Sequence, residues 1–578
     1  MPIRYAAGMV IPSPLGAIVV ALLVAAPSTA AQVAYRAFPL YDVPSSGALN
    51  VSSTFVSDAG DVNNDGTGDV IIRMGDDGNG NDVVAIISGA TGSPLYTYAE
   101  PAGTAFGDSV SGAGDVNNDG FDDFIIGALD NTGFPASGTP SVYSGATGSV
   151  IHTFSGDDPN NPFGDFFGAA VSGAGDVNND GFDDVIIGAF SDDTNGVASG
   201  RAYVFSGATG QELYSFFGVN AFDAFGDSLG GVGDVNNDGF DDFAIVAPNE
   251  EVNNETEGRT RVYSGATGAV LYTIPGGPGL GAMSSVSDAG DVNNDGTGDF
   301  ILGFTGNSQI EGTARVYSGA TGAVLFVLTS PSGDEEFGFS VSGAGDANGD
   351  GFDDVIVGSP MGSRGSASVF SGATGEELIS VTNALQFNLG QSVSGAGDVN
   401  NDGLDDLIVA SPGRNAGTLG IATVYESALV PIGAACLPDG SCVDGVTEAE
   451  AAALGGTFRG AGSVCDGTCP PPLGACCIVV DGTCIQLTED ECAQLGDGLW
   501  LGAETICDAN NDGVPDGMCN PPGTCRADVN GDGFVTPTDF TAWINAYNNN
   551  LPECDQNGDA ACTPTDFTAW IANFNAGC

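Results

Sequence analysis

The residues in this chain best suited to hold a ligand are aspartates and asparagines that recur in seven short loops. Each loop has Asp at positions 1, 5 and 9, Asn at position 3 and Gly at position 6. The loops begin at Asp61, Asp115, Asp176, Asp234, Asp291, Asp346 and Asp398. Side chains at positions 1, 3 and 5 of such a turn point inward, and glycine lets the chain reverse. These hard oxygen donors suit Ca²⁺, whereas the loops contain no His or Cys for zinc.

The spacing therefore predicts one calcium ion per loop, about seven in all. The carbonyl of position 7 is expected to join four side chains in each loop. Those side chains are Asp61, Asn63, Asp65, Asp69; Asp115, Asn117, Asp119, Asp123; Asp176, Asn178, Asp180, Asp184; Asp234, Asn236, Asp238, Asp242; Asp291, Asn293, Asp295, Asp299; Asp346, Asn348, Asp350, Asp354; and Asp398, Asn400, Asp402, Asp406. Asn-Asp-Gly is also a good hairpin turn, but a turn alone does not require three acids in every copy. We expect structural ions, so that chelation should destabilise the fold.

The loops begin 52 to 61 residues apart, which marks an array of one supersecondary unit. In the second unit a short alternating segment leads into Asp115, and residues 124–127 form a buried-type strand after the loop. Residues 141–143 and 149–154 then flank a Ser-Gly-Ala-Thr-Gly turn. Four short strands joined by Gly-rich turns, without helical periodicity, describe a blade of a β-propeller. The chain is therefore predicted to be mainly β.

The ends of the array indicate how the ring closes. The seventh unit reaches residues 422–425 and then lacks both the Ser-Gly-Ala-Thr-Gly turn and a fourth strand. Residues 33–38, ahead of the first unit, have the pattern of a fourth strand. We expect them to complete the last blade and remove an open edge. The sequence thus predicts a seven-bladed propeller over residues 31–428.

This pattern resembles the FG-GAP repeat of integrin α-subunit propellers and their bacterial relatives, over residues 33–428. The first and fifth units lack the Phe-Gly pair, and Asn replaces Asp at the third loop position. Integrins bind ligand on the face opposite their calcium loops, so the resemblance places a protein or glycan ligand there. That face would carry the variable loops 130–140, 156–162, 192–200, 249–258 and 332–336, which are otherwise explained as drifting acidic surface loops.

Composition restricts the partners and the compartment. The chain has 75 acidic residues, 11 Arg, no Lys and a formal charge of −64, which excludes nucleic acid and anionic membranes as partners. Residues 1–30 read as a secretion signal, with Arg4, an apolar stretch over 15–26 and small residues at 28–31. This stretch is shorter than the ~18 to 20 residues of a membrane span. All 14 Cys lie at or beyond position 436, which fits a secreted or surface location.

Residues 429–522 predict two related disulfide-rich units. Cys436, Cys442, Cys465 and Cys469 align with Cys477, Cys484, Cys507 and Cys519, and four cysteines allow three connectivities. Cys476 and Cys492 align with Ala435 and Ala451, and their joint absence from the first unit predicts a Cys476–Cys492 bond. Capping boxes at Thr447 and Thr488 each predict a short helix. A further loop repeats the calcium spacing at Asp508, Asn510, Asp512 and Asp516.

Residues 523–578 contain a duplicated twelve-residue loop, and the last four positions of each copy begin the segment Thr-Pro-Thr-Asp-Phe-Thr-Ala-Trp-Ile, which predicts a helix. EF-hand-like spacing selects as ligands Asp528, Asn530, Asp532, Thr536 and Asp539, then Asp555, Asn557, Asp559, Thr563 and Asp566. With the Asp508 loop, up to three further calcium ions are predicted beyond residue 500. The module resembles a type I dockerin with a Gly-Cys ending, which implies a small α-helical fold and a cohesin-like or surface-anchoring partner. Ala560 stands where this second loop should have Gly.

Three functions fit these features. The favoured hypothesis is a secreted, calcium-binding adhesion or ligand-binding propeller displayed by its dockerin-like C-terminus. The alternative is an extracellular polysaccharide hydrolase or lyase, since paired carboxylates in the variable loops need no motif. Against catalysis, the single His is His152, on an expected strand, and no nucleophile–base arrangement is visible. A bare structural spacer is the third reading.

Overall fold

The computed structural model describes most of residues 55–431, apart from loop segments at 77–80, 102–103, 130–137, 157–163, 253–254, 257, 278–281, 307–309, 331–335, 362–364, 383–387 and 413–420. It also describes the backbone at 18–21 and 33–44 and parts of 433–503. Two compact units are present, one over residues 1–25 and 35–430 and the other over 26–34 and 431–578.

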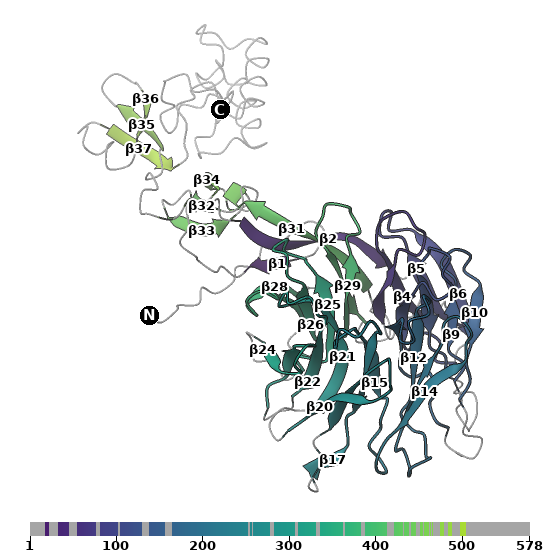
Figure 1. Ribbon diagram of the computed structural model, residues 1–578. Helices are drawn as coiled ribbons and strands as arrows, with labels where there is room; N and C mark the ends of the chain where they lie inside the picture. The colour runs from purple at the N-terminus through teal and green to yellow at the C-terminus, as the bar shows by residue number, and fades with distance from the viewer. Residues whose placement is uncertain are drawn as a thin grey trace, which may run out of the picture. The chain divides into compact units, whose positions relative to one another are not determined.

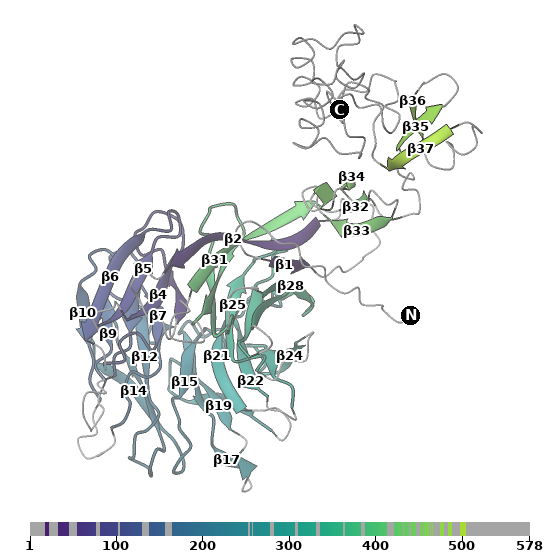
Figure 2. The same ribbon diagram turned by 180° about the vertical axis from the view of Figure 1, so that it is seen from behind.

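The first unit is a ring of antiparallel sheets around a central channel (Figures 1 and 2). The first three blades are β3 (Val56–Gly60), β4 (Asp69–Asp76), β5 (Asn81–Ile87), β6 (Pro94–Pro101); β7 (Val110–Gly114), β8 (Asp123–Ile126), β9 (Ser141–Tyr143), β10 (Val150–Thr153); and β11 (Val171–Gly175), β12 (Asp184–Ala189), β13 (Arg201–Phe205), β14 (Glu212–Phe217).

Blades 4 to 6 repeat this order from the channel outward. Their strands are β15 (Ser228–Gly233), β16 (Asp242–Ala247), β19 (Arg259–Tyr263), β20 (Val270–Pro275); β21 (Ala282–Gly290), β22 (Asp299–Thr305), β23 (Thr313–Tyr317), β24 (Val324–Thr329); and β25 (Ser340–Gly345), β26 (Asp354–Ser359), β27 (Ser366–Phe370), β28 (Glu377–Thr382). Blade 4 carries an extra hairpin of β17 (Glu251–Val252) and β18 (Glu255–Thr256). The prediction of four strands per blade is confirmed.

Blade 7 combines the two ends of the propeller sequence. Its sheet order is β2–β31–β30–β29, from β2 (Val33–Pro44), β31 (Ile421–Pro431), β30 (Asp406–Ser411) and β29 (Ser392–Gly397). A segment ahead of the first unit therefore supplies the fourth strand of the last blade, as the sequence predicts. The remaining strand, β1 (Ile18–Ala21), pairs with the outer edge of blade 6, Ile18 opposite Thr382. The other blades are complete with four strands, so β1 is not required for closure.

Residue size explains the packing of the blades. The second strands are buried along their whole length, as in β12 and β16, because a neighbouring blade covers each of their faces. The innermost strands are rich in Gly, Ala and Ser, which lets neighbouring inner strands approach closely near the axis. A Cβ on Gly112, for example, would lie 3.1 Å from the carbonyl oxygen of Asp58 on the previous blade. Larger side chains pack between blades farther out: Phe154 of blade 2 lies 4.5 Å, ring to ring, from Phe205 of blade 3.

The second unit contains two small sheets of matching topology. The first has the order β33 (Cys442–Val446), β32 (Gly433–Cys436), β34 (Thr457–Ala461), and the second β36 (Cys484–Leu487), β35 (Gly474–Ile478), β37 (Gly498–Ala503). Cys436 pairs with Cys442 in register, and Cys477 pairs with Cys484 in the same way. The two related units expected from the cysteine spacing therefore share one strand arrangement. Among the described residues, no helix is long and apolar enough to cross a membrane.

A disulfide joins Cys442 to Cys465, and Cys436 is also disulfide-bonded. The Cys442–Cys465 bond excludes the two connectivities in which Cys442 pairs with Cys436 or with Cys469, and Cys469 lies outside the described residues. Ala435 and Ala451 are fully buried, and Gly456 lies between the backbones of Cys436 and Ala451. The predicted Cys476–Cys492 bond between their counterparts in the second unit stays a prediction, because Cys492 lies outside the described residues. The capping box at Thr447 also lies outside them.

Candidate functional site: the acidic loops and the central channel

The first aspartate of each acidic loop fixes the turn. In blade 2 the Asp115 carboxylate accepts hydrogen bonds from the backbone N–H groups of Asp119, at 2.9 Å, and Gly120, at 2.8 Å. The same two bonds form in all seven loops. Asn118 has a φ of 55°, a left-handed conformation that asparagine tolerates better than most residues. Positions 1, 4 and 6 therefore shape one loop geometry around the ring.

The last aspartate of each loop joins the two turns on this face. Asp123 is fully buried, and its Oδ1 accepts the backbone N–H of Gly145, in the Ser-Gly-Ala-Thr-Gly turn, at 2.9 Å. The equivalent bond recurs in every blade, and in blade 7, which lacks that turn, the N–H of Ser427 takes its place at 2.7 Å from Asp406. The two turns thus share one face of the propeller, as predicted. We call it the loop face.

Burial and like charge act together on this aspartate. The pKa of Asp123 is raised to about 7, chiefly by desolvation and also by the charges of Asp119 and Asp115, against the lowering effect of the hydrogen bond from Gly145. The pKa of the equivalent aspartate is raised to between about 6 and about 8 in the other loops, for the same first cause. Positions 1, 5 and 9 therefore place three mutually repelling carboxylates in one loop.

The donor set fits calcium in its chemistry, since each loop gathers carboxylate and amide oxygens and no nitrogen or sulfur ligand. The Asn117 amide nitrogen lies 2.9 Å and 3.2 Å from the two oxygens of Asp123. A rotation of that amide group by 180° would exchange the positions of its nitrogen and its oxygen. The amide oxygen, which can bind a metal ion, would then point into the loop. In the described part of the chain, no three acidic, His or Cys side chains lie close enough to hold a metal. The calcium sites therefore remain a prediction from the sequence.

Position 8 of the loop has a role that the spacing argument missed. Asp122 of blade 2 accepts the backbone N–H of Asp61 of blade 1 at 2.7 Å, so one blade caps the acidic loop of its neighbour. Position 8 is Asp in five loops and Gly in two. The two exceptions, Gly68 and Gly298, occur in the units that carry Asp58 or Asp288 where the others have Gly on the inner strand. In these two units Asp and Gly have changed places relative to the other five units. The pattern is visible in the sequence and could have identified position 8 as a functional position.

A second link between blades was also missed. The Tyr214 hydroxyl donates to the carbonyl of Gly265 in the next blade at 2.8 Å, and Tyr96 and Tyr272 do the same at 2.7 Å. His152, the only histidine, occupies the equivalent position in blade 2, with its Nε2 2.6 Å from the Gly207 carbonyl. The role of His152 in this structure is therefore to bridge two blades.

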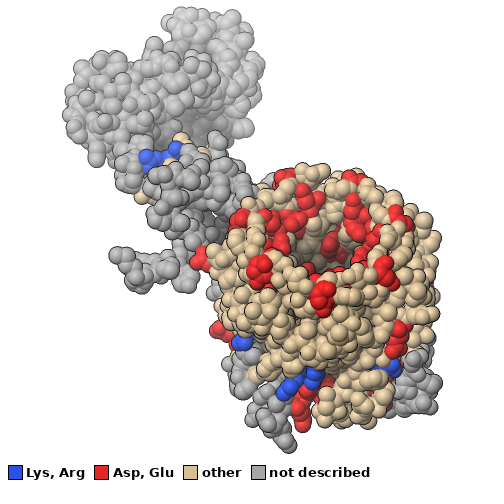
Figure 3. Space-filling model, viewed as in Figure 1, with Lys and Arg blue, Asp and Glu red and all other residues tan. Residues whose placement is uncertain are grey.

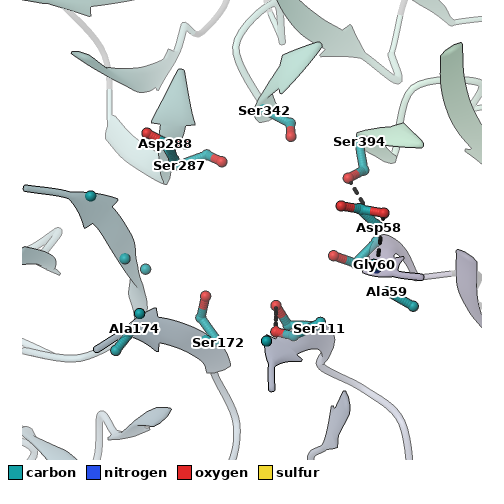
Figure 4. A pocket seen from close by; sticks show the side chains of 18 of the residues that line it. Asp58, Ala59, Gly60, Ser111, Ser172, Ala174, Ser287, Asp288, Ser342 and Ser394 are labelled. Carbon is teal, nitrogen blue, oxygen red and sulfur yellow. Dashed lines mark hydrogen bonds between the residues drawn. The ribbon is translucent and has the colours of Figure 1, made fainter. Parts of the chain in front are cut away.

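The central channel opens among the acidic loops. Its 470 Å³ cavity is lined by serines of six inner strands and by aspartates, and no basic side chain lines it. Figure 3 shows acidic side chains around the open mouth, and Figure 4 shows Asp58, Ser111, Ser172, Asp288 and neighbouring serines directed into the channel. Desolvation, together with the charges of nearby aspartates, raises the pKa of Asp58 and of Asp288 to about 6. Both side chains remain exposed to the channel, where solvent limits this effect.

The opposite face, which we call the variable face, is built differently. In blade 3 the loop over residues 190–200 and the connection over 218–226 are bound together: Phe222 N–H donates to the Val197 carbonyl at 2.7 Å, and Phe225 N–H to that of Ser199 at 3.1 Å. Asp223 is buried and accepts the N–H groups of residues 219 and 220. Phe222 nevertheless has a φ of 70° and is 64% exposed, with Val219 60% and Val197 55% exposed. An ordered loop pair thus presents apolar side chains to solvent.

Part of the predicted site set lies outside the described residues. This applies to the loop at Asp508, Asn510, Asp512 and Asp516 and to the whole duplicated module from Asp528 to Asp566. The variable loops 130–140, 156–162, 249–258 and 332–336 are described only in part. Loop 192–200 is described throughout and lies on the face that the sequence argument assigned to it.

The geometry defines a β-propeller whose blades are tied together by repeated acidic turns. Family comparison agrees: an FG-GAP repeat model matches residues 225–266, 337–372 and 389–425, and a dockerin type I domain model matches residues 526–575. The chain therefore combines an FG-GAP propeller with a C-terminal dockerin type I domain.

Known proteins resemble parts of the propeller. Integrin alpha-V of Gallus gallus is 31% identical over 230 residues, 36% of this chain and 21% of that protein, and integrin alpha-4 of Xenopus laevis is 34% identical over 153 residues, 24% and 14%. The chain thus spans about a fifth or less of the length of these relatives. Among solved structures, BBS1N in complex with ARL6DN (TM-score 0.42, 9% identity) and the Dos1 propeller (0.38, 13%) each align over 68% of this chain and 96% or 95% of their own.

Proposed function

We propose that this protein is a secreted, calcium-stabilised propeller that binds an extracellular protein or glycan on its variable face. In this proposal the dockerin domain displays the propeller on a scaffold or cell surface through a cohesin-like partner. The observation that carries it is the contrast between the two faces. The loop face repeats one set of structural bonds in every blade, whereas the variable face holds ordered, exposed apolar loops in blade 3. Binding usually resides on variable loops held by a rigid scaffold.

Calcium is assigned a structural role at seven loops in this proposal. Each loop concentrates three carboxylates on a turn that joins two strands, and its ninth position is fully buried. A bound divalent cation would offset the repulsion among them and stabilise the folded state. Up to three further ions are proposed for the loops beyond residue 500, in keeping with the dockerin match.

The variable face supports binding through its rigidity. The carboxylate of Asp193 accepts the N–H of Ala198 at 2.7 Å, and the amide of Asn195 donates to the Gly218 carbonyl at 3.0 Å. Holding Phe222 in a left-handed conformation costs about 1–3 kcal/mol, which the surrounding hydrogen bonds must offset. A surface ordered in advance loses less conformational entropy when a partner binds. We therefore assign Val197, Val219 and Phe222 to the binding surface.

We assign no catalytic role to the propeller. Its histidine bridges two blades, and its loop-face aspartates hold turns, which leaves these residues committed to structure. The relatives named above are integrin α-subunits, which are not enzymes. A polysaccharide-degrading activity is the outcome that would replace this proposal.

The test is a binding screen of the full chain against immobilised polysaccharides and extracellular proteins, in calcium and in EDTA, beside hydrolysis assays on the same polysaccharides. A V219S/F222S variant is compared with V327S, which removes an apolar side chain 53% exposed on the outer strand of blade 5. Binding that V219S/F222S abolishes and V327S retains would support the assignment. Equal binding by all three proteins would refute the assigned surface, and turnover of a polysaccharide would refute the non-catalytic reading.

A further inference from the structure

The contacts between neighbouring blades, which we call seams, are not equivalent on the loop face. At five seams the position-8 aspartate of one blade accepts the backbone N–H of position 1 in the preceding blade. These bonds are Asp122 to Asp61, Asp183 to Asp115, Asp241 to Asp176, Asp353 to Asp291 and Asp405 to Asp346, at 2.7 to 2.9 Å. Each is charge-assisted and partly buried, so it is among the stronger hydrogen bonds in the ring.

Four of the seams carry a second bond on this face. The position-4 asparagine donates its amide to the position-6 glycine carbonyl of the next blade, as Asn118 does to Gly181 at 2.8 Å. The equivalent bonds start from Asn64, Asn179 and Asn294. Both kinds of bond therefore connect the loop of one blade to the loop of the next.

The seams between blades 4 and 5 and between blades 7 and 1 lack the first bond, because position 8 is Gly298 or Gly68. Within the described residues, Asn237 and Asn401 also make no amide bond to the next loop, unlike their four counterparts. The space beside one glycine of each loop also differs between these seams and the others. A Cβ on Gly60, Gly114, Gly175, Gly290 or Gly345 would overlap the neighbouring aspartate, whereas one on Gly233 would meet nothing within 4 Å.

Blades 1 and 5, which lack an aspartate at position 8, have one on the inner strand instead. Asp58 and Asp288 stand on the inner strands where the other units have glycine, and both face the channel. The Asp58 carboxylate accepts the N–H of its own Gly60 at 3.1 Å, so it satisfies its own strand end instead of a neighbouring blade. The acid is therefore present in all seven blades but links blades at only five seams.

We propose that the loop face of the propeller opens first at these two seams, which divide the ring into an arc of blades 1–4 and an arc of blades 5–7. The apolar clusters between blades continue across both seams, as in the cluster that holds Val246 of blade 4 and Leu302 of blade 5, so the opening is confined to the loop end. The outer strands stay joined at the first of them, through the Tyr272 bond to Gly319. The inner strands stay joined at both: Ser228 accepts the N–H of Val286 at 3.3 Å at the first seam, and Ser394 accepts that of Asp58 at 3.0 Å at the second. The two seams are the points where the mouth of the channel widens. This inference depends on neither ligand binding nor calcium affinity.

Hydrogen exchange of the full chain, followed by mass spectrometry in saturating calcium and in EDTA, tests the ranking of the seams. The position-1 amides of Asp234 and Asp398 should exchange about tenfold faster than those of Asp61, Asp115, Asp176, Asp291 and Asp346. The ranking is read within one sample, so it holds or fails whether or not calcium stabilises the fold. Equal protection at all seven positions would overturn the proposal.

A paired exchange of residues provides the matched control. In D288G/G298D the new Cβ lies 3.4 Å from the Val232 carbonyl, so blade 5 can adopt the common arrangement and bond to Asp234. Exchange at Asp234 should then slow about tenfold, with no change at Asp398. In D58G/G68D the Cβ of residue 68 would overlap the Ala396 carbonyl, so this variant should melt at a lower temperature instead. Conversely, D241G should speed exchange at Asp176. A D288G/G298D protein that folds but leaves Asp234 unprotected would refute the proposal.

Discussion

The two faces of the propeller use the same scaffold for opposite purposes. On the loop face, carboxylates accept backbone N–H groups of their own turn, of the second turn and, at five contacts between blades, of the preceding blade. On the variable face an ordered pair of loops leaves Val219 and Phe222 exposed to solvent. The difference shows that the residues repeated in every blade have a structural role. The repeated acids hold the ring, and we propose that the part that does not repeat recognises a partner.

Removal of a buried loop-face carboxylate should have the largest effect. Asp123→Ala leaves the N–H of Gly145 and the Asn117 amide without their acceptor, at a cost of about 2–4 kcal/mol in the free energy of unfolding. Urea unfolding of the variant and of Asp123→Asn, which keeps an acceptor oxygen, would measure it. A loss below about 0.5 kcal/mol for Asp123→Ala would show that this carboxylate does not hold the two turns together.

Breaking a link between outer strands should cost less. Tyr214→Phe removes the hydroxyl that donates to the Gly265 carbonyl and should lower the free energy of unfolding by about 1 kcal/mol. The natural comparison is Phe326 in blade 5, whose ring packs over Gly375 in the next blade without such a hydroxyl. Phe326→Tyr should therefore be neutral or stabilising. Equal stability of wild type and Tyr214→Phe would reduce this link to simple packing.

The channel aspartates should give a small effect that depends on pH. The raised pKa of Asp288, about 6 against 3.8, means that the folded state binds a proton more readily than the unfolded state between those values. The stability from that proton is present at low pH and is lost as the pH rises through about 6. Asp288→Asn should thus raise Tm by about 1–2 °C at pH 7.5 and leave it unchanged near pH 4. A larger gain at pH 4 than at pH 7.5 would contradict this sign.

Changes on the variable face should scarcely affect stability. Because Phe222 is 64% exposed, Phe222→Ser removes little buried apolar area, and any relief of its strained backbone is small. We expect Tm to change by less than about 1 °C while ligand binding weakens. Thermal melting beside the binding screen would check both. A large loss of Tm would show that the exposed ring is a structural element of blade 3.

Repetition made much of this protein predictable from its sequence. The spacing of the acidic loops predicted the number of blades. The incomplete seventh unit and the strand-like segment at residues 33–38 predicted how the ring closes, because an unpaired edge strand is costly. The shared face of the two turns also followed from strand order. The exchange of Asp and Gly between position 8 and the inner strand could mark the residues involved, but their partners could not be predicted from the repeat, because the bonds join residues about 60 positions apart, such as Asp122 and Asp61, and depend on the spacing of the blades in the ring.

The exposed loop pair of blade 3 was only partly foreseen. The sequence marks residues 192–200 as a variable loop but does not mark the partner segment over 218–226, because that segment contributes through backbone hydrogen bonds. Nothing in the residue types Val-Asn-Ala-Phe indicates that Phe222 adopts a left-handed conformation. Local conformation of this kind is set by the tertiary contacts around the loop.

The central claim is that calcium binding at the acidic loops stabilises the ring. Its most direct test is thermal melting of the full chain with added Ca²⁺ and after exhaustive EDTA treatment, with bound metal counted by elemental analysis. The account predicts about seven or more calcium ions per chain and a melting temperature lower by roughly 10 °C or more without them. An EDTA-treated protein that holds no calcium and melts at the same temperature as the calcium-loaded one would contradict it.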